Sequence, residues 1–222
     1  MSDSYPVLTR RQARDVDLRA MRDYGLSGLV LMENAGRGCA TLLERLGING
    51  PVCVCSGKGN NGGDGYVVAR YLDNGGHQVR VASAVDPDTL TGDAAVNHGV
   101  FSASGGTVSV IDPAGWDREL KGADWIVDAL LGTGTQGDVR SPFTEAIDAI
   151  NRTSSPVLAI DLPSGIDCDT GAVLGTAVQA RHTATFVAAK QGFQARGLQD
   201  WTGEVHVIDI GIPRSLREEV LG

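Results

Sequence analysis

The chain has 222 residues, of which 42% are hydrophobic, and a formal net charge of −8 at pH 7. This length can bury a substantial core, and we expect one domain over residues 1–222. An acidic chain with interspersed charges excludes a sequence-independent nucleic-acid binder, and no apolar run reaches the length of a membrane span, which excludes a membrane partner.

Two helices are predicted in the first part of the chain. Thr9 can cap a segment whose apolar residues recur at helical spacing as far as Tyr24. The second predicted helix, Leu29 to Leu46, is apolar around most of its circumference but contains Glu33 and Asn34. Two interpretations of this polar pair stay open: a polar seam on a helix that packs against a sheet, or side chains that border a functional site.

A glycine-rich segment follows, from Pro51 to Leu72. Val52 to Cys55 form a short apolar run, which is typical of a strand buried on both faces of a parallel sheet, and helical spacing resumes at Tyr66. Four glycines lie between the strand and the helix: Gly57, Gly59, Gly62 and Gly63. Glycine lets a ligand approach backbone N–H groups closely, so this turn is predicted to hold an anion or a phosphate.

The same turn fits the dinucleotide-binding pattern G-x-G-x-x-G only in part. The next predicted strand, His77 to Val85, has Ser83 where an acidic ribose ligand is expected. Asn60, Asn61 and Asp64 add side-chain oxygens that a plain pyrophosphate turn does not need, and no Gly-Lys-Ser/Thr completes a P-loop. An intact redox cofactor is therefore disfavoured, although an NAD-dependent oxidoreductase remains an alternative.

The rest of the chain alternates predicted strands and helices. After His77 to Val85, the predicted elements are a helix at Thr91 to Ser104, a strand at Thr107 to Asp112, a short helix near Pro113, a strand at Trp125 to Gly132, a helix at Ser141 to Arg152, and strands at Val157 to Gly165, His182 to Ala189 and Glu204 to Ile210. This alternation predicts an α/β fold with a mainly parallel, doubly wound sheet that has helices on both faces.

Cysteine use indicates a reducing compartment. The chain has four cysteines, Cys39, Cys53, Cys55 and Cys168. No two of them form a C-x-x-C motif, and no histidine stands at zinc-ligand spacing. Free buried thiols follow, and the first residues lack the apolar core of a secretory signal. We expect a cytoplasmic protein. The four histidines lie away from any serine nucleophile motif, which disfavours a histidine-based hydrolase.

Ligands of doubly wound sheets bind outside the carboxyl ends of the strands. A second G-x-G-x-x-G, formed by Gly132, Gly134 and Gly137, follows the strand that contains Asp128. Asp128 and Asp161 both stand inside apolar runs, where an unpaired carboxylate is costly. The pair of glycine loops is predicted to bind phosphate, with flexible turns of tight geometry as the structural alternative.

Hard oxygen donors follow three of the predicted strands. Asn61, Asp128 and Ser164 would form a site for an alkali or alkaline-earth cation if their strands are neighbours, and a hydrogen-bond cluster is the alternative. Lys190 follows the strand at His182 to Ala189. It could act as an acid or base or as a point charge for phosphate, or it could be an exposed loop lysine.

Five segments then match one known family in order: LMENAGR, SGKGNNGGDGYVVAR, DALLGTG, DLPSGID and FVAAKQG. From about Thr9 to Pro213 the chain resembles the YjeF N-terminal domain family, the NAD(P)H-hydrate epimerases. The resemblance implies a Rossmann-like three-layer αβα fold. It also implies a stand-alone enzyme that interconverts the R and S forms of hydrated NADH and NADPH and works with a separate ADP- or ATP-dependent dehydratase. A homodimer is compatible with it.

The family's functional residues fall on matching residue types. The resemblance implies one potassium ion (K+) per subunit, held by Asn61, Asp128 and Ser164. It implies substrate contacts at Asn60, Asn61, Gly62, Gly63, Asp64, Gly132, Thr133, Gly134, Thr135, Gln136, Gly137, Asp138 and Asp161.

The reaction needs proton transfer at C6 of the damaged nicotinamide ring. Our hypothesis is that Asp161 transfers the proton and that Lys190 is a second acid/base or electrostatic partner. A non-catalytic nucleotide-binding or scaffold protein on the same fold is the alternative, because the family also includes an apolipoprotein A-I-binding protein. Scaffolds tend to lose catalytic oxygens, and here those oxygens remain.

Overall fold

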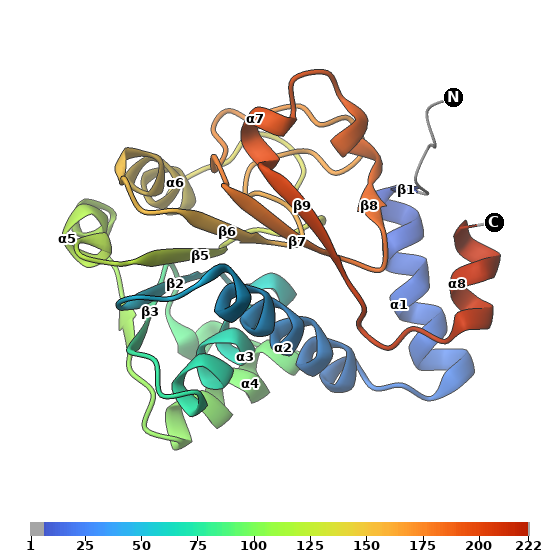
Figure 1. The fold of residues 1–222 in the computed structure, drawn as a ribbon, viewed down its shortest axis with the longest axis horizontal. Helices are drawn as coiled ribbons and strands as arrows, with labels where there is room; N and C mark the ends of the chain where they lie inside the picture. Colours follow the sequence, from blue (N-terminus) through green and yellow to red (C-terminus); the bar gives the residue numbers. More distant parts are fainter. Residues whose placement is uncertain (1–6, 222) are drawn as a thin grey trace.

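The structure, a computed structural model, describes residues 7–221 and is built around one parallel sheet. Figure 1 shows this seven-stranded sheet, whose order is β4-β3-β2-β5-β6-β7-β9. Its strands are β2 (Val52–Ser56), β3 (Val79–Ser83), β4 (Val108–Val110), β5 (Trp125–Ala129), β6 (Val157–Ile160), β7 (His182–Phe186) and β9 (Glu204–Ile208). Every pairing within this sheet is parallel, which confirms the predicted doubly wound arrangement.

Helices cover both faces of the sheet. On one face lie α2 (Gly28–Leu46) and α3 (Asn60–Asn74), with α4 (Gly92–Ala103) against α3 (Figure 1). On the other lie α5 (Trp116–Leu120) and α6 (Phe143–Arg152). Each face of the sheet has its own hydrophobic core, and successive strand residues alternate between them. Val52 and Val54 belong to the core beneath α2 and α3, whereas Cys53 and Cys55 belong to the core beneath α5 and α6. The three-layer α/β fold is therefore confirmed.

Several elements lie outside this core and were not all predicted. Thr9 caps α1 (Arg10–Tyr24) through a reciprocal capping box with Gln12, as its position in the sequence indicated. A two-stranded parallel pair, β1 (Val7–Leu8) and β8 (Ala189–Lys190), escaped prediction because each strand is so short. The remaining elements are α7 (Gln199–Thr202), α8 (Arg214–Leu221) and the 3₁₀ turns Pro87–Thr89, Pro113–Gly115 and Gln191–Gln194.

Helix α3 begins earlier than its sequence predicted, at Asn60 instead of near Tyr66. Its glycines allow close packing within the core. A Cβ on Gly62 would lie 2.1 Å from the carbonyl oxygen of Gly57, and a Cβ on Gly63 would lie 2.6 Å from the sulfur of Met32. The prediction that both glycines open the turn for a ligand is therefore wrong: they let the start of α3 pack against its surroundings.

All four cysteines are buried free thiols, as predicted. Within residues 7–221, no helix combines the length and the apolar character that a bilayer crossing requires.

Candidate functional site

A large pocket opens at the carboxyl ends of β2, β5 and β6. Its volume is about 1160 Å³. The chain runs outward from β2 to β3 and β4 and then returns to β5 on the other side of β2, so β2 and β5 flank the topological switch point. Residues that follow β2, β5 and β6 all line the pocket, including Asn61, Leu130 and Asp161. The three strands are neighbours in the sheet, which is the condition on which the predicted cation site depends.

Asp128 lies fully buried beneath the pocket wall, near the end of β5. The backbone N–H of Ser164 donates to Asp128 Oδ2 at 2.8 Å, and the Ser164 hydroxyl donates to Oδ1 at 2.6 Å. The N–H of Leu130 also donates to Oδ1, at 3.2 Å. Burial raises the pKa of Asp128 to about 6, although hydrogen bonds from Ser164 and Leu130 lower it in part.

Asn61 completes this group of oxygens from the first turn of α3. Its Nδ2 donates to the carbonyl of Leu131 at 2.9 Å, while the N–H of Leu131 donates to Ser164 Oγ at 2.8 Å. Asn61 Oδ1 is buried and has no hydrogen-bond partner among residues 7–221. The structure thus brings Asn61, Asp128 and Ser164 together, and one of their oxygens is left available to a ligand or an ion.

Asp161 and Lys190 form a buried ion pair on another wall of the pocket. Lys190 is 2% exposed, and its Nζ lies 2.7 Å from Asp161 Oδ1. The ammonium also donates to the carbonyl of Phe186 at 3.1 Å. Asp161 follows β6 with a left-handed backbone, at φ 65°, and its N–H donates to the carbonyl of Ala184 at 2.7 Å. The interpretation of Lys190 as an exposed loop lysine is therefore wrong.

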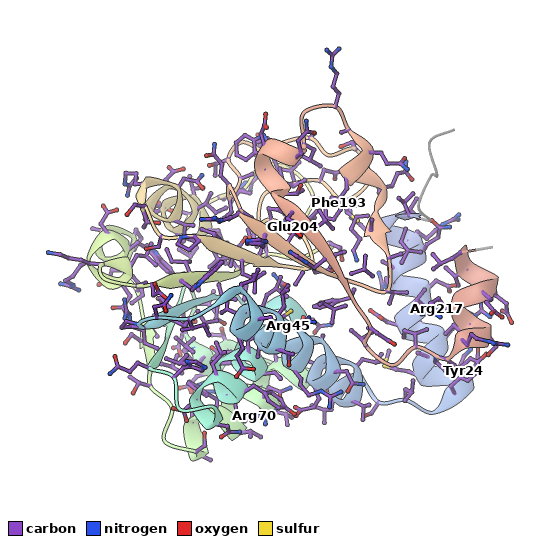
Figure 2. All side chains as sticks on the ribbon, viewed as in Figure 1. Tyr24, Arg45, Arg70, Phe193, Glu204 and Arg217 are labelled. Atoms are coloured by element: carbon purple, nitrogen blue, oxygen red, sulfur yellow. The ribbon has the colours of Figure 1, made fainter. Side chains whose placement is uncertain are left out.

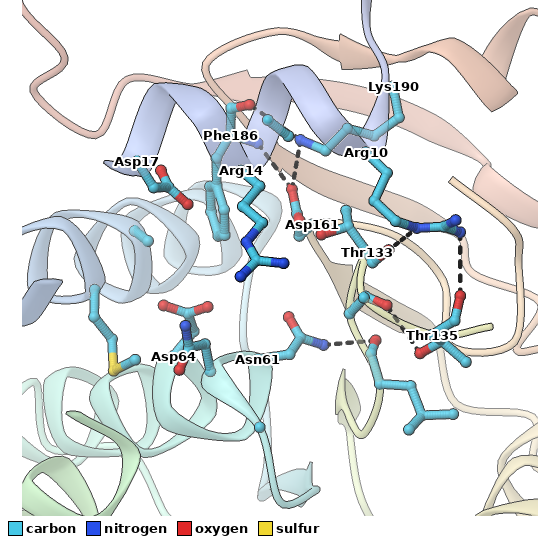
Figure 3. A pocket seen from close by; sticks show the side chains of 18 of the residues that line it. Arg10, Arg14, Asp17, Asn61, Asp64, Thr133, Thr135, Asp161, Phe186 and Lys190 are labelled. Atoms are coloured by element: carbon cyan, nitrogen blue, oxygen red, sulfur yellow. Dashed lines mark hydrogen bonds and ion pairs between the residues drawn. The ribbon is translucent and has the colours of Figure 1, made fainter. Parts of the chain in front are cut away.

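Helix α1 contributes pocket residues that sequence reasoning missed. Arg10, Arg14 and Asp17 line the pocket, and Figure 3 shows Arg14 and Asp17 directed toward Asp64 and Asp161. Their numbers differ by four and then by three, the spacing of residues on one helical face, and this polar stripe was the available signal. These residues lie on a helix and not at a strand end, which is where a doubly wound fold predicts its ligands.

Among the carboxylates that line the pocket, Asp64 and Asp17 are affected by the charge of Asp161. Burial raises the pKa of Asp64 well above its usual value, and the charges of Asp161 and Asp17 add to this effect. Asp17 reaches solvent through the pocket, yet desolvation by the surrounding protein, followed by the charge of Asp161, raises its pKa to about 6. Burial and the neighbouring negative charges thus raise the pKa of two pocket carboxyl groups, Asp64 and Asp17.

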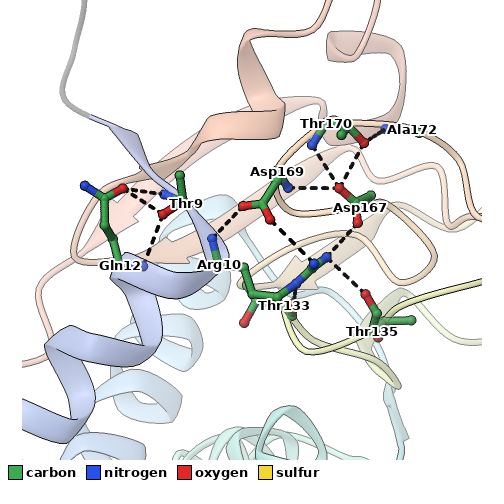
Figure 4. A network of polar contacts seen from close by, with 9 residues as sticks. All are labelled: Thr9, Arg10, Gln12, Thr133, Thr135, Asp167, Asp169, Thr170 and Ala172. Atoms are coloured by element: carbon green, nitrogen blue, oxygen red, sulfur yellow. Dashed lines mark hydrogen bonds and ion pairs between the residues drawn. The ribbon is translucent and has the colours of Figure 1, made fainter.

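Arg10 connects three segments at the edge of the pocket (Figure 4). Its guanidinium donates to the carbonyls of Thr133 at 2.6 Å and Thr135 at 3.1 Å, and to Asp167 Oδ2 at 2.6 Å. Its backbone N–H donates to Asp169 Oδ1 at 2.7 Å. Burial opposes ionisation of Asp167, but the hydrogen bonds from Arg10 and Thr170 lower its pKa to about 2. Arg10 thus fixes the loop after β5 against the loop after β6.

Most of the predicted substrate contacts line the pocket, and four do not. The residues on the wall are Asn60, Asn61, Asp64, Gly132, Thr133, Gly134, Thr135, Gln136 and Asp161, together with Lys190. Gly62 and Gly63 are buried in packing contacts, and Gly137 and the exposed Asp138 lie outside the wall. Gly57 also packs against backbone, since a Cβ there would lie 1.8 Å from the carbonyl oxygen of Leu130. In the β2–α3 turn, Gly59 lines the pocket and has open space around it.

Comparison with known proteins places this site in a family. The sequence model of the YjeF-related protein N-terminus matches residues 28–192. An NAD(P)H-hydrate epimerase of Pirellula staleyi is 45% identical over 225 residues, which cover 98% of each chain. An NAD(P)H-hydrate epimerase of Rhodopirellula baltica is 41% identical over 211 residues, covering 95% of this chain and 86% of the relative.

Longer and structurally characterised relatives give the same assignment. A bifunctional NAD(P)H-hydrate repair enzyme of Salinibacter ruber is 40% identical over 227 residues, covering 94% of this chain but 41% of the relative. A yeast protein of known crystal structure superimposes with a TM-score of 0.85 at 25% identity, covering 96% of this chain and 93% of the other. By its sequence, its fold and the extent of both matches, the chain belongs to the YjeF-related N-terminal family, whose members include the NAD(P)H-hydrate epimerases.

Proposed function

We propose that this protein is an NAD(P)H-hydrate epimerase, an isomerase that interconverts the R and S forms of hydrated NADH and NADPH in metabolite repair. The observation that carries the proposal is the Asp161–Lys190 ion pair, which lines a pocket of about 1160 Å³ together with Gly59 and the loop Gly132 to Gln136. The full-length similarity to two proteins of this name supports it.

The proposed reaction is a reversible loss and return of water at C6 of the hydrated ring. An acid protonates the C6 hydroxyl, and the C6–O bond breaks with its electrons on oxygen. Water departs, and the ring is left as an iminium, with a double bond between C6 and the ring nitrogen. Water then attacks C6 from the other face, and a base accepts its proton, so no electrons are gained or lost overall. We assign this proton transfer to Asp161, with Lys190 as its electrostatic partner.

The rest of the substrate can be bound by groups that the pocket presents. The open backbone around Gly59 stands at the N-terminus of α3, where N–H groups and the helix dipole favour an anion. The loop Gly132 to Gln136 lies across the pocket and is held in place by Arg10. These two segments are the proposed contacts for the pyrophosphate and ribose groups.

A potassium ion fits the oxygens beneath the pocket. Asn61 Oδ1 is buried without a partner among the described residues, Asp128 supplies negative charge, and Ser164 supplies a hydroxyl. These are hard oxygen donors, which suit an alkali cation. We propose that Asn61, Asp128 and Ser164 hold the ion, whose positive charge would offset the buried carboxylate.

Removal of Asn61 Oδ1, the side-chain oxygen without a hydrogen-bond partner among residues 7–221, tests the ion site. We expect potassium at about a hundred times the dissociation constant of the site to stabilise the folded wild type by about 2.7 kcal/mol, relative to LiCl of equal ionic strength. This corresponds to a rise of roughly 5 to 10 °C in the melting temperature. Asn61→Ala should lose this difference, whereas Asn74→Ala, at an exposed site near the end of α3, should retain it. An equal potassium effect in Asn61→Ala would rule out this site.

The proposed activity can be measured directly. Purified protein is incubated with R-enriched NADH hydrate, and the S form is followed by chromatography that resolves the two epimers, with a protein-free blank for spontaneous conversion. We expect the mixture to reach its equilibrium composition faster than the blank. Conversion at the blank rate would contradict the proposal and favour a binding or scaffold role.

Two further parts of the proposal concern the cellular setting. The epimer produced would be consumed by a separate ADP- or ATP-dependent dehydratase. Four buried free thiols favour a reducing compartment, and we propose that the enzyme works in the cytoplasm.

A further inference from the structure

A second group of potential ligands lies on the edge of the sheet, away from the pocket. His182 begins β7 and pairs in register with Glu204, the first residue of β9, while His206 pairs with Ala184. Side chains two residues apart on a strand share one face, so all three project from the same side of the sheet. Figure 2 marks Glu204 on this edge strand.

The ligand atoms of these residues converge. His182 Nδ1 lies 3.1 Å from His206 Nε2. One carboxylate oxygen of Glu204 lies 3.7 Å from His182 Nδ1, and the other lies 3.8 Å from His206 Nε2. The three ligand atoms lie within 4.8 Å of one another.

The cluster is separate from the substrate pocket. Its residues stand at or near the amino ends of β7 and β9, whereas the pocket opens at the carboxyl ends of the strands. None of the three lines the pocket. One flank is closed by the ring of Trp125, whose centroid lies 5.9 Å from that of His182. The other is open, because the Glu204 side chain is 69% exposed.

We propose that His182, Glu204 and His206 bind a divalent transition-metal ion of the zinc class. Two imidazoles and one carboxylate are a donor set that suits such ions. Ligands placed tetrahedrally around zinc stand about 3.4 Å apart, given zinc–nitrogen and zinc–oxygen distances near 2.1 Å. The two imidazole nitrogens lie 3.1 Å apart, and a different oxygen of Glu204 lies 3.7 or 3.8 Å from each of them; every one of these separations is within about half an ångström of the tetrahedral value.

Charge and access also agree with a bound cation. The carboxylate of Glu204 lies 3.7 Å from His182 Nδ1 and 3.8 Å from His206 Nε2, so it supplies negative charge beside both imidazoles. The exposure of Glu204 leaves a path by which an ion can enter and a place for water in the remaining coordination position. The competing arrangement is a plain hydrogen bond between the two rings, which requires one of the facing nitrogens to be protonated.

A metal at this position would join the edge strand to the sheet. Strand β9 ends the strand order and is hydrogen-bonded within the seven-stranded sheet to β7 alone. Coordination by two ligands from β9 and one from β7 would fix the register of this last pairing. The site could not be predicted from the sequence, because His182 and His206 are 24 positions apart and come together only through strand pairing.

The test uses the full chain with any purification tag removed and with metal stripped by a chelator. Zn²⁺ is titrated by calorimetry, and Co²⁺ is used as a spectroscopic probe because tetrahedral coordination gives intense visible absorption. We expect the wild type to bind one Zn²⁺ per chain. His206→Ala and Glu204→Gln should each weaken binding by at least ~10-fold, as loss of an important metal-site group does.

The matched control is His77→Ala, which removes a histidine that lies beside Glu44, outside the cluster. This variant should bind Zn²⁺ as the wild type does. Circular dichroism of each variant establishes that it is folded, and epimerase activity should be unchanged in Glu204→Gln. Failure of the wild type to bind stoichiometric Zn²⁺, or unchanged affinity in folded His206→Ala, would show that the cluster is only a hydrogen-bonded pair of rings.

Discussion

Asp161→Asn is expected to lower the rate of hydrate epimerisation by ~10²- to 10⁴-fold, the usual contribution of a general acid or base. The substitution keeps the size and shape of the side chain but removes its ability to exchange a proton at C6. It also avoids a backbone artefact. Asp161 adopts φ 65°, and asparagine tolerates this left-handed conformation better than alanine does. The loss should appear in kcat more than in KM, because the amide can still contact the substrate.

Two companion variants make this result interpretable. Asp73→Asn makes the same chemical change at an exposed aspartate near the end of α3 and should leave the rate unchanged. Lys190→Met removes the partner ammonium, which lies 2.7 Å from Asp161, and should alter the pH profile as well as the rate. A wild-type rate in Asp161→Asn would show that another group, with Asp64 the first to examine, transfers the proton.

Gly57→Ala is expected to destabilise the fold by about 3 kcal/mol, at the upper end of typical overpacking costs. The added Cβ would lie 1.8 Å from the carbonyl oxygen of Leu130 and 2.8 Å from its carbonyl carbon. Both are backbone atoms of the chain that follows β5, so neither can move aside as a flexible side chain would. The N–H of Gly57 also donates to the carbonyl of Ala129 at 3.1 Å, which fixes the two strand ends together.

Thermal unfolding measures this effect, with a melting temperature roughly 6 to 12 °C below that of the wild type. The control is Gly99→Ala, at an exposed helical position in α4 with no neighbouring atom within 4 Å of the added Cβ. Alanine favours helix there, so stability should rise by about 0.5 to 1 kcal/mol. Equal melting temperatures for Gly57→Ala and the wild type would contradict this prediction. They would mean that the backbone of the β2–α3 turn can shift to accommodate the added Cβ.

The strands themselves and the strand-end oxygens could be predicted because their signals are local. Apolar runs bounded by glycine marked β2 and β5, and a carboxylate inside such a run marked Asp128 as a residue that needs partners. Parallel strands then place their ends along one edge of the sheet. Convergence of Asn61, Asp128 and Ser164 follows from this geometry once β2, β5 and β6 are neighbours.

The features that escaped prediction depend on contacts between distant segments. A glycine with open space beside it and one that packs against another backbone look alike in sequence, so the sequence could not separate Gly59 from Gly62. The polar stripe of α1 lines the pocket, and the strand just before this helix, β1, pairs with β8 from the far end of the chain, a contact that the sequence does not show. Similarly, burial of Lys190 could not be inferred from a strand end, because it depends on what covers that end.

The pairing of β1 with β8 has a consequence for the order in which the protein matures. Leu8 lies in register with Lys190, so the lysine beside Asp161 is positioned by a strand from the far end of the chain. Such distant pairings close large loops and form slowly. A ribosome must therefore release residues on both sides of this pairing before the ion pair can acquire its final surroundings. We expect the sheet to assemble first and catalytic competence to arrive last, so a nascent chain can be folded for some time before it is an enzyme.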